Sequence, residues 1–125
     1  MKAFAINIFQ LLQDALNTHQ NNSSVVVNGC FKLKQVLKSL KWEEMKTVCD
    51  MAVYSRLLLS SRDKEESFIA VCNVLIAFVS STDRHASLIL LRENHIESTI
   101  LQILKDDTSS EITLRCMTQL LSTFL

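Results

Sequence analysis

Proline is absent from this chain of 125 residues, and Gly29 is its single glycine. Hairpins, and the chain reversals of α/β enzymes, depend on glycine, proline and Asn-Gly pairs. A chain so poor in these residues has few ways to form hairpins, and one glycine cannot supply a glycine-rich phosphate-binding loop. Hydrophobic residues still make up 48% of the sequence, which is enough for a buried core. We therefore expect helices joined by short polar turns.

An excess of charge of either sign is also lacking, because 13 basic residues balance 13 acidic ones. This balance disfavours binding to nucleic acid by bulk charge. No apolar run approaches the ~20 residues of a membrane span, so no membrane partner is predicted. The N-terminus begins like a signal peptide, but Asn7, Gln10 and Gln13 interrupt it and no small-residue cleavage site follows. An intracellular protein is expected, with the cytoplasm as the favoured compartment.

Clusters of residues that could carry chemistry are missing as well. The four cysteines stand far apart in apolar segments, as Cys30, Cys49, Cys72 and Cys116. They form no CxxC pair, so we expect buried, reduced thiols. The histidines are His19, His85 and His95, and none has metal-site spacing. No nucleophile stands beside a recognisable base. The sequence therefore predicts no catalytic residue, no metal ligand and no cofactor, hence a protein that is not an enzyme.

Apolar periodicity predicts seven helices, near 2–18, 24–40, 43–60, 64–81, 84–92, 95–106 and 109–125. The first helix carries one apolar face, formed by Phe4, Ile8, Leu11, Leu12 and Ala15. The second carries Val26, Cys30, Leu33 and Leu37. Three segments have the form of a capping box, which starts a helix: Asp63 to Glu66, Asn94 to Glu97 and Thr108 to Glu111.

The predicted helix at 64–81 has almost no polar face. From Phe68 to Val79 nearly every residue is apolar, with Asn73 as the polar exception. A helix that is hydrophobic on nearly all sides is buried between neighbours. We therefore expect this helix to lie inside the protein.

A weak internal repeat relates the middle of the chain to its end. A shift of 46 residues places four residues on identical ones: Leu58 on Leu104, Glu65 on Glu111, Leu75 on Leu121 and Phe78 on Phe124. Armadillo and HEAT repeats have periods of ~40–47 residues. This period suggests a chain built from repeated helical units.

The segment 83–125 resembles one armadillo unit. Residues 83–94 resemble its short first helix, 95–104 its second and 111–125 its long third helix. The helix at 64–81 resembles the third helix of the preceding unit. The resemblance implies an all-α fold, a right-handed stack of antiparallel helices forming an armadillo/HEAT-like superhelix. A compact helical bundle is the alternative.

The same resemblance divides the chain, a single helical-repeat domain over 1–125, into three parts. Residues 1–41 are degenerate N-terminal helices, 42–81 are one repeat and 83–125 are one armadillo-like repeat. The last helix ends on an apolar face without a cap, formed by Leu120, Leu121, Phe124 and Leu125. We expect further repeats, a partner or a self-contact to cover it, and a fragment of a longer array is one alternative.

Two groups of residues are candidates for binding. The resemblance places Asn73 where that family often carries a peptide-binding asparagine. A polar face of the last helix is formed by Arg115, Gln119 and Ser122, and the repeat shift maps these onto Ile69, Asn73 and Ile76. In a right-handed array this face lines the concave, partner-binding surface. The alternative is that it is only the solvent-facing side of the helix.

The second group is a basic stripe. Lys34, Lys38 and Lys41 are predicted to share one helical face, with Trp42 next in the sequence. They form either a patch for an anionic partner or a solvated face offset by the neighbouring acidic residues.

Taken together, the sequence favours a non-catalytic scaffold or adaptor that binds a partner peptide or helix. No small-molecule substrate is predicted, and the partner's identity is left open. The alternatives are a helical-bundle regulatory domain acting by homotypic association, and weak nucleic-acid binding through the lysine stripe.

Overall fold

The computed structural model describes residues 2–81, 84–105 and 111–123, and within these ranges all regular secondary structure is helical. The all-α prediction is therefore confirmed. The helices are α1 (Lys2–Thr18), α2 (Ser23–Leu37), α3 (Trp42–Val48), α4 (Met51–Ser61), α5 (Glu65–Ser81), α6 (Arg84–Glu93), α7 (Ile96–Lys105) and α8 (Glu111–Ser122).

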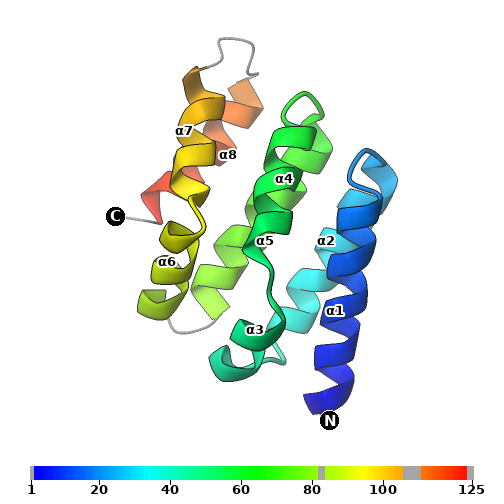
Figure 1. Ribbon diagram of the computed structural model, residues 1–125. Coiled ribbons are helices and arrows are strands. Elements are labelled where there is room, and N and C mark those ends of the chain that lie inside the picture. Colours follow the sequence, from blue (N-terminus) through cyan, green and yellow to red (C-terminus); the bar gives the residue numbers. More distant parts are fainter. Residues whose placement is uncertain (1, 82–83, 106–110, 124–125) are drawn as a thin grey trace.

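The longer helices form three antiparallel pairs that lie side by side, α1 with α2, α4 with α5 and α7 with α8 (Figure 1). One layer contains α2, α5 and α8, where α5 contacts both of the others. The second layer contains α1, α4 and α7, where α4 contacts both of the others. The short helices α3 and α6 lie at the same end of the molecule (Figure 1).

Helix α5 lies at the centre, in contact with α2, α4, α6 and α8. Both of its phenylalanines are buried, Phe68 at 0% and Phe78 at 2% exposure. The ring of Trp42 on α3 meets Phe78 edge to face, with centroids 6.2 Å apart. Burying one such side chain contributes about 1.5–3 kcal/mol. The prediction of an inner helix at 64–81 is confirmed.

The single helix predicted over 43–60 is wrong, because the structure has two helices there. Helix α3 ends at Val48, Cys49 has an extended backbone, and α4 starts at Met51. Asp50 caps α4, and its carboxylate accepts a hydrogen bond of 3.1 Å from the Ala52 backbone N–H. An Asp at this position satisfies a donor that the first turn of a helix leaves unpaired.

The side of α1 that faces the core also differs from the prediction. The buried residues are Phe9, Gln13 and Leu16. On the predicted apolar face, Phe4 is 65% and Leu11 is 69% exposed. The helix therefore carries two apolar stripes, and the packing buries the one that contains the glutamine.

Helix α2 buries the four residues expected of it, Val26, Cys30, Leu33 and Leu37. Gly29 in its middle allows α1 to approach closely, because a Cβ atom there would lie 2.9 Å from Leu16 Cδ2. Glycine weakens a helix interior by roughly 0.5–1 kcal/mol relative to alanine. Here it makes room for a fully buried leucine.

Of the three predicted capping boxes, the one at Thr108 lies outside the described residues. Helix α5 begins at Glu65, so Lys64 rather than Asp63 precedes it. The Lys64 ammonium instead donates a hydrogen bond of 2.7 Å to the Asn21 backbone carbonyl. Between α6 and α7 the backbone of His95 is left-handed, with φ of 59°, a conformation that normally favours glycine.

Candidate protein-interaction surface

The candidate site lies on the outer side of the layer formed by α2, α5 and α8. Helix α2 turns Val26, Cys30 and Leu33 towards the core, and this leaves the neighbouring positions facing out. At those positions, Val27 and Lys34 are half-buried and Phe31 is 61% exposed. A large aromatic ring on the surface is the kind of residue that anchors protein contacts.

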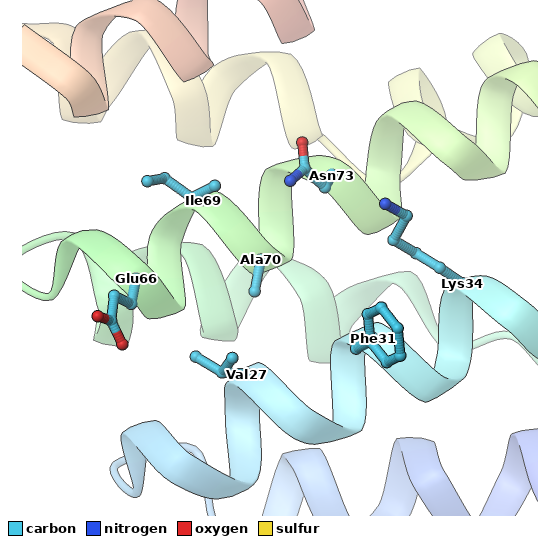
Figure 2. A pocket seen from close by; sticks show the side chains of 7 residues that line it. All are labelled: Val27, Phe31, Lys34, Glu66, Ile69, Ala70 and Asn73. Atoms are coloured by element: carbon cyan, nitrogen blue, oxygen red, sulfur yellow. The ribbon is translucent and has the colours of Figure 1, made fainter.

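A hollow of about 290 Å³ lies between α2 and α5 (Figure 2). Its lining residues are Val27, Phe31 and Lys34 from α2, and Glu66, Ile69, Ala70 and Asn73 from α5. Most of its lining side chains are apolar, and Lys34, Glu66 and Asn73 are the polar ones.

The two charged groups of the hollow have opposite signs and lie at opposite ends. Figure 2 shows Lys34 and Asn73 towards one end of the hollow and Glu66 towards the other. Apolar side chains of Val27, Ile69 and Ala70 lie between them. A partner segment in this hollow would meet a cation at one end and a carboxylate at the other.

The predicted binding residues fall into two places. The structure brings Ile69 and Asn73 together with Lys34, which the sequence had assigned to a separate basic stripe. Ile76 is half-buried on α5 outside this lining. The residues predicted on α8 share a second, shallower hollow on that helix: Arg115, Gln119 and Ser122.

Arg115 already has a partner on its own helix. Its Nη2 lies 3.0 Å from Glu111 Oε1, with both side chains more than three-quarters exposed. Exposed pairs of this spacing contribute about 0.3–0.5 kcal/mol, so a stronger interaction can displace them. Ser122 donates to the Gln119 backbone carbonyl over 2.7 Å.

The prediction that three lysines share one helical face is wrong. Helix α2 ends at Leu37, Lys38 is its C-cap, and Lys41 is the N-cap of α3. The Lys41 backbone N–H donates to Glu44 Oε1 over 3.0 Å. Trp42, the residue next to this stripe, is half-buried with its ring on Phe78. The turn at residues 38–41 breaks the stripe into separate positions, and only Lys34 lines the hollow.

Burial raises the pKa of four thiols and of one phenol, none of which lines the hollow. Burial raises the pKa of Cys30 to about 12. The pKa of Cys49 also rises to about 12, through burial and then the nearby Asp50 charge. Burial raises the pKa of Cys72, of Cys116 and of Tyr54 as well. Protonated, buried thiols are poor nucleophiles.

Within the ranges described, no three His, Cys, Asp or Glu side chains lie close enough to hold a metal ion. No helix in those ranges combines the length and the apolar character needed to cross a bilayer. The hollow thus offers shape, apolar surface and two opposite charges.

The residue that sequence reasoning missed is Phe31. Its signal was present, because Val27, Phe31 and Lys34 follow helical spacing on the side adjacent to Val26 and Cys30. Which side faces solvent depends on how α5 packs, and the spacing alone does not specify this.

No protein-family model, curated protein or solved structure matches this chain.

Proposed function

We propose that this chain is a non-catalytic protein-interaction module, a scaffold or adaptor, that docks a partner peptide or helix on the outer face of α2, α5 and α8. We further propose that its helix pairs form a right-handed, armadillo/HEAT-like stack, with 42–81 and 83–125 as successive units. An intracellular location is part of the same proposal.

Support for the stacked arrangement comes from the spacing of equivalent elements. Helices α5 and α8 begin at Glu65 and Glu111, the two residues that the 46-residue shift superimposes. Contacts between neighbouring pairs join residues at similar separations. Tyr54 and Gln13 are 41 apart in sequence, and Ser55 and Thr99 are 44 apart. Regular offsets of this size are what successive repeats of one unit produce.

Support for docking comes mainly from one observation, the hollow between α2 and α5 with Phe31 exposed beside it. Interface energy concentrates in a few central residues, often aromatic, that sit in pockets. The hollow presents such a pocket on the layer where a helical array binds its partners. The charges of Lys34 and Glu66 would set the direction of a bound segment.

The test is quantitative affinity capture from cell extract with the wild-type chain and three variants. Phe31→Ala and Asn73→Ala remove side chains of the hollow, and both are expected to leave the unfolding midpoint nearly unchanged. Leu101→Ala is the matched control, because Leu101 is 50% exposed on α7, in the other layer.

A protein captured by the wild type should be depleted at least about tenfold with Phe31→Ala, equivalent to ~1.4 kcal/mol. It should be retained with Leu101→Ala. If Phe31→Ala captured every recovered protein as well as the wild type does, the hollow would be ruled out as the binding site.

A further inference from the structure

A second surface lies along the outer edge of the α1–α2 pair, apart from the hollow on α5. Helix α1 contacts α2, α3 and α4, and it lies at the edge of the molecule (Figure 1). Its exposed stripe follows helical spacing through Phe4, Ile8, Leu11 and Ala15. Phe4 and Leu11 are each about two-thirds exposed, at 65% and 69%. Contiguous exposed apolar residues of this kind mark interaction sites.

Two hollows accompany this stripe between α1 and α2. One of about 390 Å³ is lined by Phe4, Ala5, Ile8, Lys32, Gln35, Val36 and Ser39. The other, of about 270 Å³, is lined by Leu12, Ala15, Ser24, Val25, Asn28, Gly29 and Lys32. Lys32 lines both hollows, which follow one another along the helix pair and are together called the edge groove.

The two walls of the edge groove differ in chemistry. The α1 wall is entirely apolar, from Phe4 to Ala15. The α2 wall is mixed: it carries the polar side chains of Asn28 and Gln35 together with the valines Val25 and Val36. Among the described lining residues, Lys32 is the only charged one, and it stands at the middle of the groove.

We propose that the edge groove binds an amphipathic helix of another protein, which lays apolar side chains on α1 and an acidic side chain against Lys32. An apolar α1 wall facing a mixed α2 wall suits the apolar face of such a helix, whose polar face would stay in water. The positive charge of Lys32 at the centre of the groove favours a carboxylate opposite, by charge complementarity. From Phe4 to Ala15 the groove extends about 16 Å, or three turns of helix.

The proposal is tested with a displayed library of single amphipathic helices of about 18 residues, randomised at apolar and charged positions. Selection on the folded wild-type chain is expected to enrich helices that carry Asp or Glu within the apolar stripe. Phe4→Ser, which changes a 65% exposed residue of the apolar wall, should abolish this enrichment. Leu59→Ser, which changes a 39% exposed leucine on α4, should not.

Charge reversal gives the specific readout. Against Lys32→Glu, the selected acidic helices should bind at least about fivefold more weakly, equivalent to ~1 kcal/mol. A new selection on this variant should favour Lys or Arg at the same position. Enrichment without a charge preference, or none beyond the Phe4→Ser background, would overturn the proposal.

Two further measurements decide between this occupant and others. In sedimentation velocity, self-association of the wild type that Phe4→Ser removes would mean that a second copy covers the groove, and we expect none. In flotation with vesicles of phosphatidylcholine and phosphatidylserine, we expect no binding that depends on Phe4. Either finding would contradict the proposal, because the occupant of the groove would then be a second copy of the chain or a lipid surface.

Discussion

The Gln13 side chain of α1 joins the two sides of the break between α3 and α4, and its closest partner is Asp50. The Asp50 backbone N–H donates to Gln13 Oε1 over 2.9 Å. Gln13 Nε2 donates to the Val48 backbone carbonyl over 3.0 Å, and the Tyr54 hydroxyl donates to the same Oε1 over 3.2 Å. The break leaves these partly buried backbone groups without a partner in either helix, and the glutamine satisfies them.

Replacing Gln13 with alanine should therefore be costly. Gln13 is only 5% exposed, so the carbonyl of Val48 and the N–H of Asp50 would lose their partner without gaining free access to water. Unsatisfied buried groups cost about 1–3 kcal/mol each, and we expect a loss of ~2–4 kcal/mol in urea unfolding. Gln10→Ala, at an exposed position of the same helix, should stay within about 0.5 kcal/mol. Equal effects of the two substitutions would contradict the bridging role.

Phe78→Ala tests the central position of α5. Phe78 is 2% exposed and contacts Trp42 edge to face. Removing a buried phenylalanine costs about 3–5 kcal/mol. Phe4→Ala, at a 65% exposed position, should cost less than about 1 kcal/mol. Chemical denaturation of both variants measures the difference, and a small value for Phe78 would mean that α5 is not an inner helix.

His95→Gly should stabilise the protein. The left-handed backbone of His95 costs a side-chain-bearing residue about 1 kcal/mol that glycine avoids, although glycine also loses more entropy on folding. We expect a net gain of roughly 0.5 kcal/mol in thermal or urea unfolding. His85→Gly, at an exposed position within α6, should have the opposite sign. A loss of stability with His95→Gly would show that the side chain has a structural role.

Stability should fall as the pH rises above 9. Unfolded thiols ionise near the ordinary pKa of 9.0, whereas in the folded chain the pKa of Cys30 and of Cys49 is about 12. The unfolded state thus releases protons first, and each thiol lowers the free energy of unfolding by up to about 1.4 kcal/mol per pH unit between these values. Tyr54, whose pKa is raised by burial, adds to the fall above pH 10.

Urea midpoints from pH 8 to 10.5 measure this effect, and Cys30→Ala should make the decline shallower. A profile that stays flat over this range would show that the thiols are already accessible to water in the folded protein.

The parts of the fold that the sequence predicted are those fixed by local pattern. Helix α5 has almost no polar face, so its burial can be predicted without knowing which helices surround it. The break at Cys49 and Asp50 depends on Gln13, which is 37 residues from Asp50 in sequence, and no local pattern reports that bond.

Helix α1 shows a second limit. Its two apolar stripes, one containing Phe9 and Leu16 and the other Phe4 and Leu11, have the same spacing. Periodicity identifies both stripes but cannot say which one packs against α4, because that choice is made by tertiary contacts. The exposed Phe31 of the candidate site escaped prediction for the same reason.

The most direct test of the proposed docking site is photo-cross-linking in cells with benzoylphenylalanine in place of Phe31. A probe at this position lies beside the hollow between α2 and α5, and the same probe in place of Leu59 on α4 is the control. The account predicts a discrete cross-linked partner from position 31 that is absent from position 59. Identical adduct patterns from the two positions, or none from position 31, would contradict it.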